Sequence, residues 1–207
     1  MVTTLDTSPS PLCSRLSIDT FVIITALFKA SEPCLAQERG LYLLARSLEE
    51  DRHSLDKEVT AARKVAIGEK ILSNLLRYFG NAHNPASVRR WIGLLVAELL
   101  QDCEENGNLV DLGPEDIRRA LGQTATGDKC QILRLVAGTM IRGMISLGIQ
   151  EANFWPIDAD ERMFADFPRG QHHTSQWVVD FEEYLDSIFS QGISNELSLQ
   201  LPFSCTI

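Results

Sequence analysis

Apolar residues recur at intervals of three and four positions through most of this 207-residue chain, and Gly, Pro or Asn residues separate one such stretch from the next. That interval places the apolar side chains on one face of an α-helix, whereas a half-buried strand alternates apolar and polar residues. No stretch alternates convincingly in this way. The sequence therefore predicts an all-α protein, a multi-helix bundle or an irregular helical-repeat-like array of about seven helices around one core.

Composition divides the chain into three parts. Residues 1–16 are rich in Ser, Thr and Pro, which predicts a flexible or extended leader. The helical patterns occupy residues 17–192, which we assign to one helical domain, long enough to bury a core of its own. Residues 193–207 alternate weakly and predict an extended tail. The apolar run over residues 20–28 follows an aspartate and predicts a buried helix rather than a cleaved signal.

Capping signals predict where the first long helices begin and end. Ser54 is expected to cap a long helix that Gly80 terminates, with Gly68 as a weak point or a close helix crossing. The dipeptide at 84–85, Asn followed by Pro, is the clearest start signal, and we expect its helix to run to the Asn-Gly pair at 106–107.

The second half of the chain predicts three further helices. A short helix is expected to begin after the Gly-Pro pair at 113–114, and Asp128 is expected to cap a long central helix that Gly148 ends. Residues 175–191 predict a final two-faced helix. Its outer side is acidic, and its inner side carries four large apolar residues, Trp177, Phe181, Tyr184 and Ile188.

The chain is acidic, with 28 Asp and Glu residues against 19 Lys and Arg residues and a formal net charge of −9. This charge repels a phosphate backbone, so direct nucleic-acid binding is disfavoured unless a local basic face opposes it. Two arginine pairs are the candidates for such a face, Arg89 with Arg90 and Arg118 with Arg119. A basic surface on a partner protein fits the acid excess better.

Metal and thiol chemistry find little support in the sequence. The five cysteines are odd in number and lack a C-x-x-C pair, which predicts reduced thiols in an intracellular protein of the cytoplasm or nucleus. Glu50 and His53 have the spacing of a carboxylate-bridged metal site, and His172 and His173 are adjacent, but both pairs lack further ligands. We therefore predict no metal and no cofactor, and leave open whether these pairs join a three-dimensional site. No uncharged stretch approaches the ~20 residues of a membrane span.

The absence of a convergent catalytic set favours a non-enzymatic interaction module. We expect a scaffold or adaptor subunit of a multiprotein assembly that binds a peptide or helix of a partner in a groove between helices. The partner is expected to carry a basic or amphipathic helical segment, and homo-oligomer formation stays open. The expected anchors are aromatic residues of the irregular region 153–170 and the helix after it: Phe154, Trp155, Phe164, Phe167 and Trp177. A packed satellite core is an equally weighted alternative for the aromatics of that region.

Two other classes of protein remain open at this stage. One is a subunit of a nuclear, DNA-associated complex that contacts nucleic acid weakly or through its partners, using the four arginines named above. The other is an enzyme whose acids or histidines converge only in three dimensions, since catalytic partners are often far apart along a chain.

Overall fold

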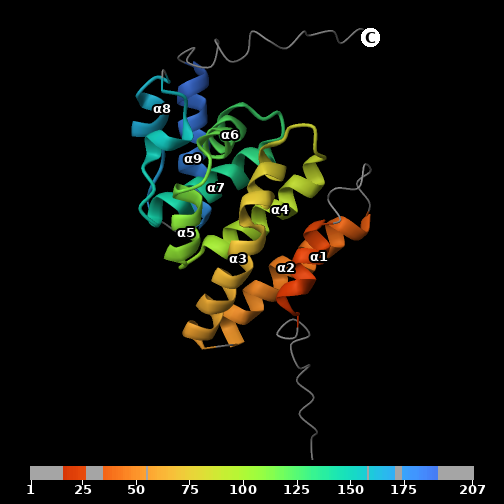
Figure 1. Ribbon diagram of the computed structural model, residues 1–207. Helices are drawn as coiled ribbons and strands as arrows, with labels where there is room; N and C mark the ends of the chain where they lie inside the picture. The colour runs from red at the N-terminus through yellow and green to blue at the C-terminus, as the bar shows by residue number, and fades with distance from the viewer. Residues whose placement is uncertain (1–15, 27–34, 55, 158, 171–173, 191–207) are drawn as a thin grey trace, which may run out of the picture.

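The computed structural model describes residues 16–26, 35–54, 56–157, 159–170 and 174–190. All regular secondary structure in these residues is helical, and one core joins the helices, so the all-α prediction is confirmed. The predicted tail and all but the last residue of the predicted leader lie outside the described residues. The elements, in chain order (Figure 1), are α1 (Ile18–Ala26), α2 (Leu35–Ser54), α3 (Lys57–Gly80), α4 (Ala86–Leu100), α5 (Glu104–Asp111), α6 (Glu115–Gly127), α7 (Gln131–Ser146), the 3₁₀ helix η3 (Glu151–Phe154), α8 (Arg162–Ala165) and α9 (Thr174–Ser190).

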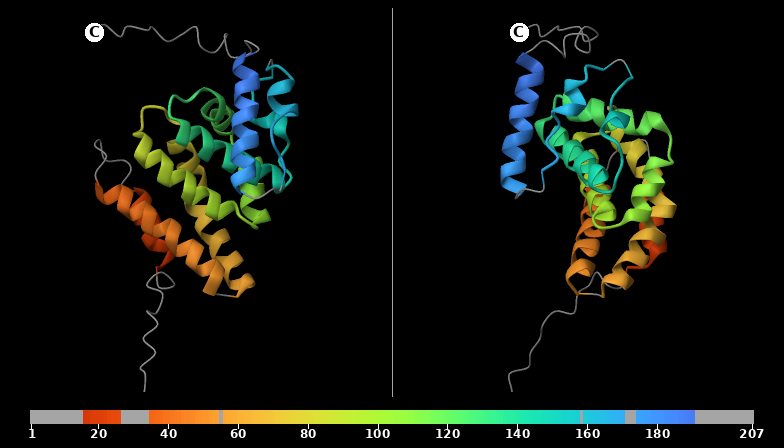
Figure 2. Two further views of the ribbon diagram at one scale, coloured as in Figure 1. Left: turned by 180° about the vertical axis from the view of Figure 1, so that it is seen from behind. Right: turned by 90° about the vertical axis from the view of Figure 1, so that its left-hand side faces the viewer.

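Helices α2 and α4 pack side by side and run in the same direction, while α3 makes the return between them (Figure 2, left). Their register is constant, because residues 49 positions apart meet at both ends. Near the start, the Ser87 hydroxyl donates to Glu38 Oε1 at 2.5 Å. Near the end, Arg52 Nη1 donates to Gln101 Oε1.

The central helix of the second half is α7, as predicted. It packs against α4, α6, η3 and α9. At Gly138 the rings of α9 come so close that a β-carbon would lie 2.7 Å from Phe181 Cζ. The apolar face predicted for α9 is buried there, with Trp177 1% and Phe181 0% exposed, and α9 itself forms one edge of the molecule (Figure 2, right).

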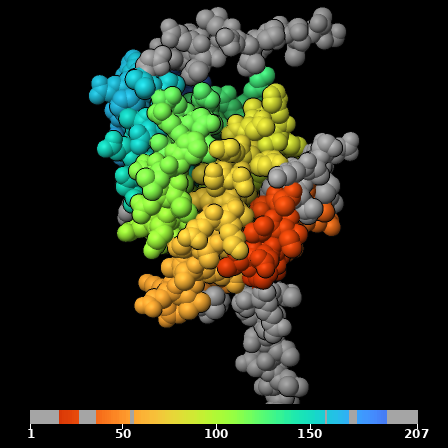
Figure 3. Space-filling view, in the orientation of Figure 1, coloured from red at the N-terminus to blue at the C-terminus, as the bar shows by residue number. Residues whose placement is uncertain are grey.

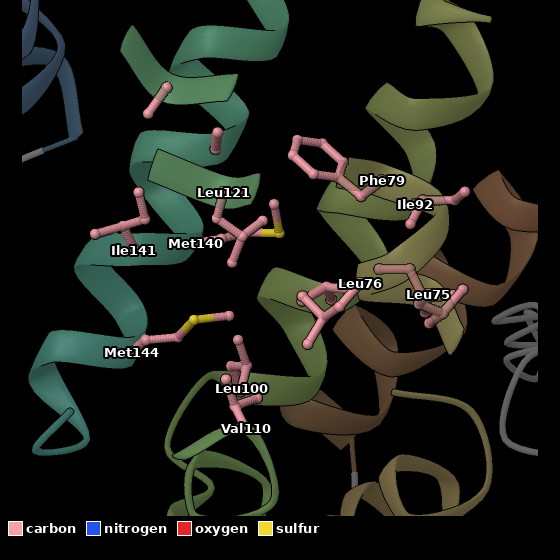
Figure 4. Close-up of a cluster of buried hydrophobic side chains, with 14 of the residues drawn as sticks. Leu75, Leu76, Phe79, Ile92, Leu100, Val110, Leu121, Met140, Ile141 and Met144 are labelled. Atoms are coloured by element: carbon pink, nitrogen blue, oxygen red, sulfur yellow. The ribbon is translucent and has the colours of Figure 1, made fainter. Parts of the chain in front are cut away.

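The core lies where α3, α4, α5, α6 and α7 converge. Figure 4 shows apolar side chains from all five helices meeting there, among them Leu76, Leu100, Val110, Leu121 and Met140. One side of helix α3 faces this core. At the surface, α1 and α5 lie against α3 (Figure 3). Burial of apolar faces on this scale is the main force that holds such helices together.

Two predicted start signals are displaced by one or two residues. Ser54 is the last residue of α2, and Asp56 caps α3 because its Oδ1 accepts the backbone N–H of Glu58 at 2.8 Å. Asn84 does not cap α4, since its side-chain amide donates instead to the carbonyl of Tyr78 at 2.7 Å. Gly80 ends α3 as predicted.

The predicted end of the fourth helix at residues 106–107 is wrong. Helix α4 ends at Leu100, Asp102 follows with a φ of 54°, and the Asn-Gly pair lies inside a separate helix, α5. The side chain of Asn106 is fully buried, and its Nδ2 donates to the carbonyl of Leu99 at 2.8 Å. A residue that is typical of helix ends therefore satisfies the end of a neighbouring helix.

The signals around the central helix are partly confirmed. Helix α6 is 13 residues long rather than short. Asp128 lies at the end of α6, two residues before Cys130 at the start of α7, and its Oδ1 accepts the backbone N–H of Cys130 at 2.9 Å. Gly148 follows the end of α7 with a φ of 96°, a conformation that favours glycine.

Candidate binding groove between α2, α4 and α7

A groove of about 670 Å³ opens between α2, α4 and α7. This volume lies within the range of about 300–1,000 Å³ that is typical of ligand sites. Each of the three helices presents residues at steps of three and four, so that each lines the groove with a single face. The lining from α2 is Tyr42, Ala45, Arg46 and Glu49; from α4 and its end, Trp91, Leu94, Ala97, Glu98, Leu100, Gln101 and Asp102; from α7, Thr139, Met140, Arg142, Gly143 and Ser146; Arg169 completes it.

One end of the groove is aromatic. The rings of Tyr42 and Trp91 meet edge to face, with centroids 5.1 Å apart, and Tyr42 remains 43% exposed. The guanidinium of Arg90 lies 5.3 Å from the Trp91 ring centroid and covers it from outside. Leu94 lies one turn further along α4 and is half-buried. This end offers apolar contact area with little flexibility, as aromatic residues do at protein interfaces.

The opposite end is charged. Glu49 pairs with Arg46, whose Nη1 lies 2.6 Å from Glu49 Oε2. Among the described residues, Glu98 has one long ion pair, with its Oε2 3.8 Å from Arg52 Nη1, and this buried oxygen accepts no hydrogen bond from them. Burial raises the pKa of the Glu98 carboxyl above its ordinary value, although Arg52 and Lys64 oppose the shift. An additional donor at this oxygen would relieve an unsatisfied buried group.

A buried lysine contacts the end of α4 behind this end of the groove. Lys64 of α3 donates through Nζ to the carbonyl of Gln101 at 2.8 Å, just past the end of α4. Its burial lowers its pKa, with the nearby Glu98 partly opposing that shift. The Lys64 ammonium group thus donates a hydrogen bond to a carbonyl at the end of α4, where the helix itself supplies no donor.

The α7 side of the groove carries two arginines that are already engaged. Arg142 stacks over the Trp177 ring with its guanidinium carbon 5.3 Å from the ring centroid, and burial lowers its pKa. Arg169 Nε lies 2.9 Å from Glu151 Oε1. Between them Gly143 leaves open space, because a β-carbon at this position would meet nothing within 4 Å.

The five aromatic residues predicted as anchors lie elsewhere. Four are buried, Phe154, Trp155, Phe167 and Trp177, and Phe164 is half-buried. Their rings pack on one another and on α9. The Phe167 and Phe181 centroids are 6.0 Å apart, and Trp177 stacks on Phe181 at 5.0 Å. In this conformation the four buried rings belong to the one hydrophobic core and offer no surface to a partner, and a binding role for the five stays a prediction.

The four arginines predicted for nucleic-acid contact do not form one basic face. Arg89 is buried and donates through Nε to the carbonyl of Phe79 and through Nη1 to Asp128 Oδ2, both at 2.7 Å. Arg118 is also buried, and its Nη1 caps the end of α5 by donating to the carbonyls of residues 110, 111 and 113. Arg90 is exposed, and Arg119 pairs with Glu115 at 2.7 Å. Half of the proposed basic face is therefore part of the internal hydrogen-bond network.

The sequence led us to expect a groove between helices but did not indicate which helices form it. Neither Tyr42 nor Trp91 was assigned to a site, and Trp91 is half-buried against the core while its ring meets Tyr42 of α2. The sequence holds no signal that links the two residues. Their contact depends on the register between two helices separated by a third.

Of the two histidine-containing pairs left open above, Glu50 and His53 lie in the described part of the chain. Glu50 lies 4.0 Å from Arg46 Nη2, and His53 is exposed. Within the described residues, no three His, Cys, Asp or Glu side chains gather around a common point. His172 and His173 lie outside these residues.

None of the helices that the structure describes is both long enough and apolar enough to cross a bilayer. When the chain is compared with known proteins, no family model, no curated protein and no solved structure matches it, so the candidate site rests on the geometry of this groove.

Proposed function

We propose that this protein is a non-enzymatic interaction module that binds a peptide or helix of a partner protein in the groove between α2, α4 and α7. The observation that carries the proposal is the groove itself, an opening of about 670 Å³ with an aromatic pair at one end and carboxylates at the other. Parallel, packed helices supply both ends, so the binding surface is formed before a partner arrives.

The composition of the lining supports a protein partner. Aromatic residues and Arg are enriched at the centre of protein interfaces, and the groove contains Tyr42, Trp91 and Arg46. A partly exposed aromatic pair can anchor an apolar side chain, and the surrounding charged groups can select its neighbours. The proposed role is that of a scaffold or adaptor subunit.

The test uses a substitution that fills the groove without disturbing the core. Gly143→Trp puts a large ring into open space on α7, and Gly127→Trp, at the end of α6, makes the same change where a β-carbon also meets nothing within 4 Å. Wild type and both variants are used to capture proteins from the cells that make the chain, with quantification by mass spectrometry. Thermal unfolding checks that all three fold.

The expected result is a partner that wild type and Gly127→Trp capture equally and Gly143→Trp fails to capture. A segment of that partner should then bind the purified wild-type chain in calorimetry, with affinity lost in Gly143→Trp. Capture of the same proteins in the same amounts by all three chains would contradict binding in the groove.

A further inference from the structure

We propose that the groove takes an amphipathic helix that carries an apolar side chain and, seven residues away, a Lys or Arg. The apolar side chain lies against Tyr42 and Trp91, and the cation donates to Glu98. This inference rests on the proposed function and names the chemistry of its partner. It follows from the spacing of the two ends of the groove and from the unsatisfied carboxylate at one of them.

The spacing comes from α4. Trp91 and Glu98 both line the groove and are seven residues apart, which corresponds to two helical turns or about 10 Å along the axis. Tyr42 and Glu49 repeat the same interval on α2, which runs parallel to α4. A partner helix laid along this pair meets the aromatic end and the acidic end at positions i and i+7 of one face, with apolar residues between them against Leu94.

The charge preference comes from Glu98. Its Oε2 is buried, accepts no hydrogen bond from the described residues and lies 3.8 Å from Nη1 of Arg52. Asp102 adds negative charge at the same end, where Glu49 is paired with Arg46, and the parallel helices α2 and α4 both end there, so that their partial negative charges add.

The cations near this end are already used. Arg46 lies on Glu49 at 2.6 Å, and Lys64 donates to the carbonyl of Gln101 at 2.8 Å. Glu98 lines the groove and its side chain is 21% exposed, so a basic side chain from a partner can pair with its carboxylate. The net charge of −9 would steer a basic segment toward the protein.

The test selects helices from a displayed library. Peptides of about 18 residues, or five turns, on an alanine-rich scaffold are randomised along one face. They are selected on the full wild-type chain and counter-selected on Gly143→Trp, so that groove-dependent binders remain. The best of these are synthesised, and their dissociation constants are measured against wild type, Glu98→Gln and Glu183→Gln. Glu183 is exposed on α9 and controls for the loss of one negative charge.

The expected result is enrichment of Lys or Arg seven residues from an apolar residue, with affinity falling about tenfold in Glu98→Gln and less than about twofold in Glu183→Gln. Circular dichroism and thermal unfolding establish that both variants fold. Groove-dependent peptides without basic enrichment, or with unchanged affinity for Glu98→Gln, would overturn this inference and leave groove binding intact. A selection that yields no groove-dependent helix would count against both proposals.

Discussion

Asn106 of α5 lies so close to Gly68 of α3 that a β-carbon at residue 68 would be 2.0 Å from Asn106 Oδ1. The buried amide of Asn106 also donates through Nδ2 to the carbonyls of Lys64 at 3.1 Å and Leu99 at 2.8 Å. One side chain thus joins α3, α4 and α5 at the charged end of the groove. Asn106 fits in this position because residue 68 is a glycine and has no β-carbon.

Gly68→Ala should therefore destabilise the fold, although alanine favours helices by about 1 kcal/mol over glycine. The added carbon would displace Asn106 and strain its hydrogen bonds, at a cost of about 1–3 kcal/mol beyond that gain. Urea unfolding measures the difference. Gly143→Ala is the matched control, because it meets open space in α7 and should stabilise the protein by up to about 1 kcal/mol.

A double-mutant cycle separates this contact from other effects. In an Asn106→Ala background, Gly68→Ala should cost much less, because the displaced side chain is gone. Equal costs of Gly68→Ala in both backgrounds would show that the two residues are not coupled.

Arg89→Met should lower the free energy of unfolding by about 3–5 kcal/mol, since it leaves a largely buried Asp128 without its partner and the carbonyl of Phe79 without its donor. Arg90→Met, one residue along the same helix and exposed, should cost less than about 1 kcal/mol through loss of its contact with the Trp91 ring. Chemical denaturation compares the two variants. Similar losses in both would contradict the internal role assigned to Arg89.

Glu98→Gln should change how stability depends on pH. Burial raises the pKa of Glu98 in the folded state, so that the folded chain holds this proton more tightly than the unfolded chain does. The free energy of unfolding should accordingly fall as pH rises from about 4.5, the ordinary value, through the raised pKa. In Glu98→Gln that part of the fall is absent.

The measurement is urea unfolding of both chains at several pH values between about 4 and 7. The stability of Glu98→Gln relative to wild type should rise with pH across this window and then level off. Glu183→Gln, with its exposed carboxyl removed, provides the reference for a general change in net charge. Parallel curves for wild type and Glu98→Gln would contradict the buried, unsatisfied state of this carboxyl.

Phe181→Ala should cost about 3–5 kcal/mol, because the ring is fully buried on α7 and stacked against Trp177. Val179→Ala, two residues earlier on the same helix and 48% exposed, should stay within about 0.5 kcal/mol. Thermal unfolding compares the two. Equal small effects would mean that α9 contributes little to the core.

Truncation before Thr174 extends the same prediction. The shortened chain would expose the surface around Gly138 that Trp177 and Phe181 cover, and it should aggregate or dimerise. Light scattering after size-exclusion chromatography measures the outcome. A monomeric remnant that unfolds cooperatively would make α9 a detachable arm.

Local signals in the sequence were sufficient for the helical class and for several helix ends. The apolar face of α9 and the glycine at residue 148, with its φ of 96°, follow from interactions within a few residues, so their pattern predicts them directly. The cap of α3 was misplaced by two residues because both Ser54 and Asp56 are good capping residues, and only the packed chain selects one.

The groove and the buried polar contacts were decided by tertiary structure. Asn106 resembles a helix stop, yet it lies inside α5 because carbonyls of α3 and α4 come within reach of its amide. Tyr42 and Trp91 meet because α3 folds back and sets α2 and α4 parallel at an offset of 49 residues. Helical periodicity reports which side of each helix is apolar, but the register between distant helices depends on the packing of all their side chains together, and no stretch of sequence contains it.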